Sequence, residues 1–368
     1  MKIKLLDKYI FNQVFFTCFG CILIFMIVWI MPEILLKTVQ RTISGDYTIE
    51  MAVSILLNEL PKVLHIALPV GMLLGTILTF EKMSKDFEIT VMRSCGFSFP
   101  RIIVSAVIIS IFAAGFTFLI SAKVLPYSSC RLKAIKRMDR IAQFVFPVKR
   151  SNGSIEKIII VPHYDNMNIK DAIVLNFYNE ALDGSSLLSG ILISDYVKYD
   201  YKTWTINSAK KYSISKDGVF NNNGEDVQNV EILNGESSTN AYKLMKYSIH
   251  RDRELTNPQI SEYIKLLKAE QMDDEYRFML NKYIQRFVHS FMCILFAILG
   301  CLLGFSKPRE QKFIGMLIAV GIIFSYYITI PFFDLLAEKA VLLPQIASMI
   351  APSIAIILII ILKKVKDL

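Results

Sequence analysis

Two carboxylates, Asp86 and Glu88, lie at the centre of a charged interval that separates two long apolar runs, FEKMSKDFEITVMRSCGFSFPR. Carboxylates can act as acids, bases or metal ligands, but the rest of the sequence does not support such chemistry. The chain contains no G-x-x-x-x-G-K-[ST] phosphate loop, no G-x-S-x-G, no H-E-x-x-H and no metal-spaced cluster of Cys and His. We therefore expect no catalytic residue, no metal and no cofactor. If the protein takes part in active transport, its ATPase must be another chain.

The charged interval has the pattern of a short amphipathic helix. Met83, Phe87 and Val91 recur every four residues and predict one apolar stripe, with Ser84 as a cap at the start and Gly96 at the C-terminal cap. A helix that rests on lipid headgroups usually carries Lys and Arg without acids, whereas here the two carboxylates are central. The pattern favours a protein partner that offers a basic group over a plain connector on the lipid surface.

The elements that must hold this interval are membrane helices. Hydrophobic residues make up 54% of the 368, and the mean hydropathy is +0.45, which is outside the usual range of soluble proteins. A bilayer core of about 30 Å needs roughly 20 apolar residues per helix. The first apolar run is too long for a signal peptide and no small-residue cleavage site follows it, so we interpret it as a retained anchor. Six segments without Asp, Glu, Lys or Arg meet or approach the required length: Ile10–Met31, Val63–Phe80, Ile102–Ala122, Phe287–Ser306, Phe313–Phe333 and Ala340–Leu362.

The short segments between these helices predict the orientation of the chain. Lys and Arg gather before the first span, between the second and third, between the fourth and fifth, and after the sixth, and they are few in the opposite short loops. The positive-inside rule then places both termini and the charged interval in the cytoplasm, with residues about 123–280 outside. Since so many of the basic residues lie in these segments, the net charge of +9 does not indicate a nucleic-acid partner.

A group of basic residues lies just outside the membrane, where the positive-inside rule predicts few of them. Lys and Arg bind phosphates through charge-assisted hydrogen bonds, so the group could bind an anionic lipid. Solvated loop charges are the alternative, and the enrichment on this side favours the lipid. The group comprises Lys37, Arg41, Arg131, Lys133, Lys136, Arg137 and Arg140.

The segment between the third and fourth spans has the composition of a β domain. Short β-branched or aromatic runs, such as KIIIVPHY, DAIVLNFY and AYKLMKYSIH, are separated by Asn, Asp, Gly and Ser turns at about 8–15 residue spacing. From Asn257 the periodicity becomes helical, with Thr256 as a candidate cap and Pro258 at the first position.

The expected fold is an α-helical membrane protein with six transmembrane helices (3+3) and an inserted all-β periplasmic jelly-roll domain. Residues 1–128 contain helices one to three and a short helix at about 81–97, residues 129–255 form the jelly roll, and residues 256–368 contain a linker helix and helices four to six. Within the membrane, Gly71-x-x-x-Gly75 predicts a helix contact made through small residues. The imidazoles of His65 and His289 are expected to pack rather than to bind a ligand.

Over essentially its whole length the chain resembles the LptF/LptG permeases of the lipopolysaccharide exporter. The resemblance rests on the N-terminal LLDKYIF, the run LPVGMLLGTILTFEKMSKDFEITVMRSCGFS, and LTNPQISEYIKLLK before the closing helices. Its most specific piece is an LP and LLG run that leads into S-x(3)-E-x(4)-R-x(2)-G, here Ser84, Glu88, Arg93 and Gly96. The final LLPQIASMIAPS is more similar to the LptG branch.

The resemblance implies a multi-pass subunit of the bacterial inner membrane that exports lipopolysaccharide. It pairs with a paralogous permease as a heterodimer, sits on a cytoplasmic LptB-type ATPase dimer, and joins an LptC/LptA-type jelly-roll bridge in the periplasm. By the resemblance, Glu88 contacts an arginine of the ATPase, within a coupling group of Ser84, Asp86, Phe87, Glu88, Arg93 and Gly96. The lipid-phosphate group is Lys37, Arg41, Arg131, Lys133, Lys136 and Arg137.

Two other function classes remain open from the sequence. A mechanotransmission protein would also couple a cytoplasmic ATPase to a periplasmic partner, but such proteins usually have fewer spans and no lateral lipid cavity. A membrane-anchored adaptor that uses its β domain only for protein contacts would need neither the basic group nor the coupling carboxylate.

Overall fold

The structure is a computed structural model, and the chain forms two compact units in it. The helical unit comprises Met1–Arg137 and Arg277–Leu368, and the β unit comprises Met138–Tyr276. The structure describes residues 5–136, 144–150, 154–165, 168–178, 187–200, 202–215, 217–221, 223–305 and 314–366.

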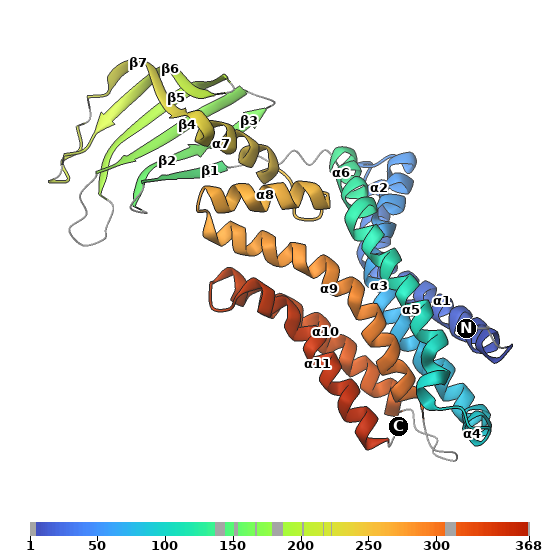
Figure 1. The fold of residues 1–368 in the computed structure, drawn as a ribbon. Helices are drawn as coiled ribbons and strands as arrows, with labels where there is room; N and C mark the ends of the chain where they lie inside the picture. Colours follow the sequence, from blue (N-terminus) through green and yellow to red (C-terminus); the bar gives the residue numbers. More distant parts are fainter. Residues whose placement is uncertain are drawn as a thin grey trace. The chain divides into compact units, whose positions relative to one another are not determined.

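Six helices of the helical unit are long and apolar enough to span a membrane, as the sequence predicts (Figure 1). Helices α3 and α9 are mostly buried within the unit, whereas α1 and α10 are mostly exposed. The first part of the unit contains α1 (Leu5–Ile30), a π-helical turn (Met31–Leu35), α2 (Leu36–Ile43), α3 (Ile49–Lys85), α4 (Glu88–Ser94), α5 (Phe99–Leu119), a second π-helical turn (Ile120–Val124) and α6 (Leu125–Ile135). The closing part contains α9 (Asp273–Gly304), α10 (Ile314–Glu338) and α11 (Pro344–Val365).

Glycines allow α3 to pack closely against α1 on one side and α9 on the other. A Cβ on Gly75 would lie 2.5 Å from the Cα of Cys18 in α1, and a Cβ on Gly300 would lie 2.7 Å from the carbonyl oxygen of Leu73. Any larger side chain at either position would therefore push the helices apart. The contact predicted for Gly71 and Gly75 is confirmed, and Gly300 and Gly304 make the equivalent contact from α9.

The β unit is built on one antiparallel sheet whose strands are ordered β1-β2-β4-β5-β6-β7, with β3 paired to β4. Trp204 and Ile206 alternate with less buried residues and are fully buried, as are Phe146 and Ile159 on other strands. Lys157 Nζ of β2 donates to the carbonyl of Ile232 in β7 at 2.8 Å, so the sheet curls and its two ends approach each other. The strands are β1 (Phe144–Lys149), β2 (Ile155–Val161), β3 (His163–Asp165), β4 (Asn168–Phe177), β5 (Leu188–Asp200), β6 (Thr203–Ser213) and β7 (Glu225–Asn234).

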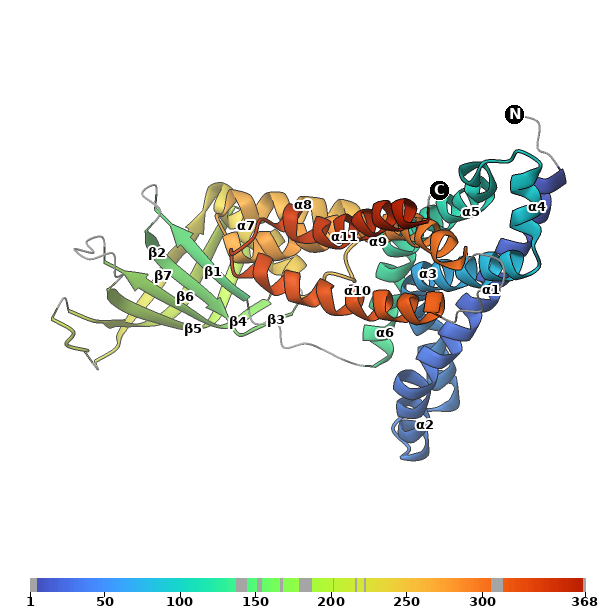
Figure 2. The same cartoon turned by 90° about the horizontal axis from the view of Figure 1, so that it is seen from below.

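One predicted strand is wrong, because AYKLMKYSIH lies in a helix, α7 (Gly235–Ser248). Its buried residues Ser238, Ala241, Leu244 and Met245 follow a helical period. Helix α7 packs against β6, β7 and β1 (Figure 2). The indole Nε1 of Trp204 donates to the carbonyl of Ser238 at 3.2 Å. Helix α7 thus covers the apolar side of the curled sheet.

Helix α8 (Asn257–Ala269) begins as the sequence predicts, with a capping box between Thr256 and Gln259. Glu262 accepts hydrogen bonds from Tyr247 Oη at 2.8 Å and from Lys243 Nζ at 3.1 Å, both on α7. The bond from Tyr247 is the main cause that lowers the pKa of Glu262. Burial, followed by the bond to Glu262, raises the pKa of Tyr247 to about 12.

These contacts move the domain boundaries away from the predicted ones. We expect the β domain over residues 129–255 and the linker helix in the last domain, but α8 belongs to the β unit because it is bonded to α7. At the other boundary, α6 continues the helix of the third span to Ile135, so residues 129–135 belong to the helical unit.

Candidate functional sites

Helix α4 is shorter than the helix expected over residues 81–97. The second membrane helix, α3, continues through Ser84 to Lys85, so Ser84 is buried inside α3 and does not cap α4. The chain then turns at Phe87, which has a left-handed φ of 61°, a conformation that side chains other than glycine rarely adopt. Asp86, exposed, ends α3, and α4 runs from Glu88 to Ser94.

Gly96 ends α4, as predicted. It has a φ of 87°, and its N–H donates to the carbonyl of Arg93 while Phe97 N–H donates to that of Met92 at 3.1 Å. This pair of bonds is the Schellman arrangement, in which glycine supplies the left-handed residue after the last turn. Both ends of α4 are therefore held by defined backbone geometry.

The apolar stripe predicted for this helix is wrong. Met83 belongs to α3 and is fully buried, but Phe87 and Val91 are exposed, at 49% and 58%. Ile89 and Met92 are the residues of α4 that pack into the helical unit. The reason is the break at Phe87, which turns α4 relative to α3 and ends the four-residue repeat. Phe87 and Val91 instead form an apolar surface that points away from the unit.

Glu88 is bonded to the first helix. Tyr9 Oη donates to Glu88 Oε1 at 2.7 Å, and Gln13 Nε2 donates to Tyr9 Oη at 2.5 Å. The second carboxylate oxygen, Glu88 Oε2, is buried, and no donor from the described part of the chain reaches it. Nearby, Arg101 NH2 and Asp7 Oδ2 form an ion pair at 2.6 Å that fixes the start of α5 on α1.

Arg93 connects α4 to the end of α9. Its guanidinium lies over the ring of Phe305, 5.8 Å from the centroid, and the ammonium of Lys366 lies 5.9 Å from the same centroid. Lys366 Nζ also donates to the carbonyl of Leu302 at 2.6 Å and to that of Phe305. A cation at the C-terminus of a helix is favourable because it binds carbonyls that lack intrahelical donors. Of the coupling group, Glu88 and Arg93 are thus the two that tie α4 to other helices.

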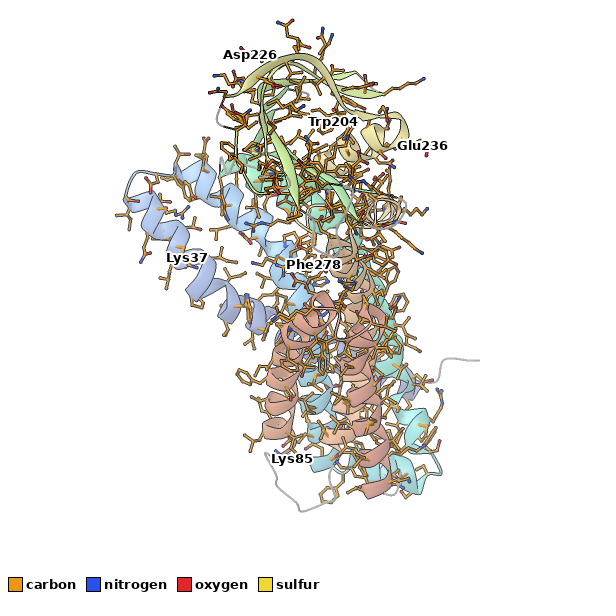
Figure 3. All side chains as sticks on the ribbon, turned by 90° about the vertical axis from the view of Figure 1, so that its left-hand side faces the viewer. Lys37, Lys85, Trp204, Asp226, Glu236 and Phe278 are labelled. Atoms are coloured by element: carbon orange, nitrogen blue, oxygen red, sulfur yellow. The ribbon has the colours of Figure 1, made fainter. Side chains whose placement is uncertain are left out.

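The basic residues predicted to bind lipid lie at the opposite end of the helical unit. Figure 3 shows Lys37 of α2 at one end and Lys85 of α3 at the other. Lys37 and Arg41 are exposed on α2, and α2 and α6 both pack against α3. Arg41 NH1 donates to Tyr47 Oη at 2.6 Å. The structure therefore brings the two basic segments, α2 and α6, to one end of the unit.

The residues on α6 differ in how they are held. Arg131 is exposed, and its guanidinium lies 4.8 Å from the ring centroid of Tyr127. Lys133 is half-buried, and Lys136 Nζ forms an ion pair with Glu59 Oε1 of α3 at 2.9 Å. Lys136 therefore already has a carboxylate partner. Arg137 and Arg140 lie outside the described residues.

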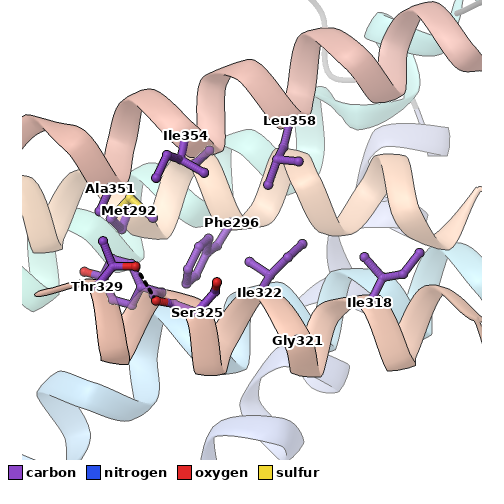
Figure 4. Close-up of a pocket in the computed structure, with 12 residues that line it drawn as sticks. Met292, Phe296, Ile318, Gly321, Ile322, Ser325, Thr329, Ala351, Ile354 and Leu358 are labelled. Atoms are coloured by element: carbon purple, nitrogen blue, oxygen red, sulfur yellow. Dashed lines mark hydrogen bonds between the residues drawn. The ribbon is translucent and has the colours of Figure 1, made fainter.

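A pocket of about 230 Å³ lies between α9, α10 and α11 (Figure 4). Thr329, on its wall, donates its hydroxyl to the carbonyl of Ser325 at 2.6 Å within α10, so this hydroxyl is satisfied by its own helix. The apolar lining includes Met292, Phe296, Ile322, Ala351, Ile354 and Leu358. Such a lining can accept hydrocarbon, and its polar side chains are Ser325, Tyr326 and Thr329.

The sequence analysis missed Tyr9 and Gln13. Tyr9 is in the N-terminal LLDKYIF, a run that contributes to the family resemblance but in which the resemblance gives no single residue a role. The contact with Glu88 joins residues 79 positions apart. No local periodicity could reveal it. The sequence analysis also missed the polar contacts of Asp334 in α10, which accepts from Asn281 Nδ2 at 2.7 Å and pairs with Lys282 Nζ of α9 at 2.6 Å.

Comparisons with known proteins relate the chain to one family. The sequence model of the family described as "Lipopolysaccharide export system permease LptF/LptG" matches residues 8–364. The lipopolysaccharide export system permease protein LptF of Escherichia coli (strain K12) is 27% identical over 144 residues, and the same values hold for LptF of Shigella flexneri. The match covers 37% of this chain and 38% of the length of each relative. Both relatives belong to the LptF branch, and not to the LptG branch that the closing helices favour.

Proposed function

This chain belongs to the LptF/LptG family of permeases of the lipopolysaccharide export system, and from this premise we propose that it is one of the two membrane subunits of an ATP-driven exporter. It is a multi-pass protein of the inner membrane. In the proposal both termini are cytoplasmic and the chain itself catalyses no reaction. ATP is hydrolysed by a separate cytoplasmic ATPase dimer.

The proposed route begins in the outer leaflet of the inner membrane. Lipopolysaccharide enters laterally between this chain and a paralogous permease, and its acyl chains lie on apolar helix faces. The exposed surfaces of α1 and α10 support this step, since Phe16 and Phe324 are 69% and 66% exposed. Large apolar side chains at such exposure need lipid or a second subunit to cover them.

The phosphates of the lipid bind the basic end of the helical unit in this proposal. Lys37, Arg41 and Arg131 support it best, because they are exposed cations on two helices that both pack against α3. Lys133 and Arg137 complete the group by the resemblance. Lys136 contributes less, because its ammonium is already paired with Glu59 and binding a phosphate would have to compete with that pair.

The coupling role rests on one observation, the two different environments of the oxygens of Glu88. One oxygen accepts from Tyr9, and the other is buried without a donor from the described chain. A buried carboxylate oxygen is unfavourable unless something donates to it. Docking of the ATPase would have to uncover this oxygen, and an arginine of the ATPase would then supply the donor, with the exposed Phe87 and Val91 packing on the ATPase beside it.

The β unit receives the lipid in the last proposed step. Its interior is apolar, with Phe146, Ile159 and Ile206 fully buried, and so could accept acyl chains if the curled sheet opens. In the described sheet β1 and β7 each pair on one side only. Either edge could accept a strand from an LptC/LptA-type jelly roll by β-strand addition, which would continue the apolar groove toward the outer membrane.

Reversing the charge at Glu88 tests the proposed coupling. We expect Glu88→Lys to leave the subunit folded in the membrane but to reduce recovery of the ATPase with it and to abolish lipopolysaccharide export, because like charges replace the pair. The measurement is co-purification of the ATPase together with transfer of lipopolysaccharide from vesicles.

Two variants serve as controls for this experiment. Glu88→Gln keeps an acceptor for Tyr9 and should lose only part of the coupling. Glu236→Lys reverses the charge of an exposed residue in the first turn of α7 (Figure 3) and should behave as wild type. Normal co-purification and normal export by Glu88→Lys would remove the coupling role from this residue.

A further inference from the structure

Pro69 lies in the middle of α3, where it has no N–H to donate to the carbonyl of His65 one turn earlier. In the structure, His289 Nε2 of α9 is 3.0 Å from that carbonyl oxygen. The hydroxyl of Tyr327 in α10 donates to the next carbonyl, that of Ile66, at 3.1 Å. Two side chains from the closing helices therefore bind the backbone of α3 one turn before Pro69.

The proton positions at His289 follow from its partners. A carbonyl oxygen can only accept, so Nε2 carries the proton. The hydroxyl of Tyr326, 2.9 Å from Nδ1, is then the donor to that nitrogen. Both ring nitrogens of a neutral imidazole are thereby used, and the ring of His65 stacks on it with 4.3 Å between centroids. The imidazole of α9 is held by α3 and α10 and has one defined orientation.

The position of this contact matters because α3 is continuous from Ile49 to Lys85 and leads directly into α4. Toward α4, α3 is packed against α9 at Gly300 and Gly304, but those contacts are non-directional van der Waals contacts. The bonds at His65 and Ile66 are directional and involve both α9 and α10. They join the first three spans to the last three at a point where the backbone of α3 relies on side chains from other helices.

We propose that His289 and Tyr327 are positioning residues that transmit displacement of α3 to α9 and α10. The proposal rests on the proposed function, in which the ATPase acts on α4. The bond from His289 replaces the one that Pro69 cannot make, and the bond from Tyr327 binds the next carbonyl of α3 as well, so movement of α3 at this level moves α9 and α10 with it. The role of His289 should therefore depend on Pro69.

The proline provides the test. We expect His289→Leu, in the transporter reconstituted in vesicles, to lower the ratio of lipopolysaccharide-stimulated to basal ATP hydrolysis by roughly 2- to 30-fold, as residues that connect coupled sites do. Tyr327→Phe removes one hydroxyl and should lower the ratio in the same direction if His289→Leu does not fold. Thr79→Val is the matched control, since that hydroxyl bonds only within α3, to the carbonyl of Gly75 at 2.8 Å.

Pro69→Ala distinguishes transmission from simple packing. It restores an N–H that can donate to His65, so the stability lost in His289→Leu should be partly recovered in the double variant, as measured by the thermal unfolding midpoint. The ATPase ratio of the double variant should stay low, because an intrahelical bond does not move α9. A wild-type ratio of lipopolysaccharide-stimulated to basal ATP hydrolysis in both His289→Leu and Tyr327→Phe overturns the proposal. Additive effects of Pro69→Ala and His289→Leu on the thermal unfolding midpoint overturn it as well.

The result also separates this proposal from the coupling role of Glu88. If Glu88→Lys exports normally while His289→Leu lowers the ratio, the contact with the ATPase lies elsewhere on the chain and the positioning role stands. If Glu88→Lys fails and His289→Leu retains the wild-type ratio, the positioning role is wrong and the coupling role stands.

Discussion

At the scale of single residues, the hydrogen bonds around Glu88 explain how a carboxylate on a short helix can be kept in one orientation. Gln13 donates to Tyr9, and Tyr9 donates to Glu88, so two side chains of α1 fix the orientation of the carboxylate. Because α1 is also mostly exposed along its apolar length, the same helix would contact both proposed partners, the ATPase and the lipid. Tyr9 would therefore link the carboxylate that is proposed to bind the ATPase to the helix that is proposed to bind the lipid.

Removing the hydroxyl of Tyr9 tests this arrangement. We expect Tyr9→Phe to weaken binding of the ATPase by about 1 kcal/mol, roughly fivefold, because the bond to Glu88 is partly exposed and is replaced by water. The subunit should keep its unfolding midpoint. The affinity can be measured by titrating purified ATPase against the reconstituted permeases, and wild-type affinity in Tyr9→Phe would show that Glu88 needs no support from α1.

At the scale of elements, α3 is the helix to which the rest of the helical unit is fastened. It contacts α1 through Gly71 and Gly75 and is contacted by α9 through Gly300 and Gly304. The sequence predicts the six spans because an apolar run of membrane length has few alternatives. The start of α4 is not predictable in the same way, because the left-handed Phe87 breaks a four-residue repeat that otherwise continues from α3.

A larger side chain at one of these glycines should separate the helices. We expect Gly300→Leu to destabilise the subunit by about 3 kcal/mol or more, since the added atoms overlap the carbonyl of Leu73 and neither backbone can move away without losing other contacts. Gly115→Leu in α5 is the control, because, apart from the backbone of its own helix, no described residue has an atom within 4 Å of a Cβ there. Equal thermal unfolding midpoints for the two variants in detergent would mean that the close crossing does not contribute to stability.

The missed helix α7 shows why the β unit was harder to predict than the spans. The run AYKLMKYSIH is rich in Tyr, Leu, Met and Ile, which suit a strand and a half-buried helix equally over ten residues. Tertiary packing decides between them, since Ala241, Leu244 and Met245 cover the curled sheet only at a helical period. The order of the strands is likewise set by contacts between distant segments.

At the scale of the whole molecule, the orientation in the membrane is the property on which both proposed sites depend. The coupling group must be cytoplasmic and the basic group periplasmic. The chain offers a direct probe, because Cys95 at the end of α4 and Cys130 in α6 have exposed thiols at opposite ends of the helical unit, whereas Cys18, Cys293 and Cys301 are buried.

Labelling these cysteines should report the orientation. A maleimide that cannot cross membranes should modify Cys130 in intact spheroplasts and reach Cys95 only after the membrane is opened. Cys95→Ser and Cys130→Ser identify each adduct by mass. Labelling of Cys95 before permeabilisation would reverse the topology and exclude the cytoplasmic role of α4.

Photocrosslinking tests the central claim, that this chain binds lipopolysaccharide on α1 and releases it when its ATPase partner works. A photoreactive amino acid at Phe16, which is 69% exposed, should crosslink to lipopolysaccharide in vesicles, and the fully buried Val14 should not. Added ATP should reduce the crosslink in wild type but not in Glu88→Lys. No crosslink at Phe16, or the same loss with ATP in both proteins, would contradict the account.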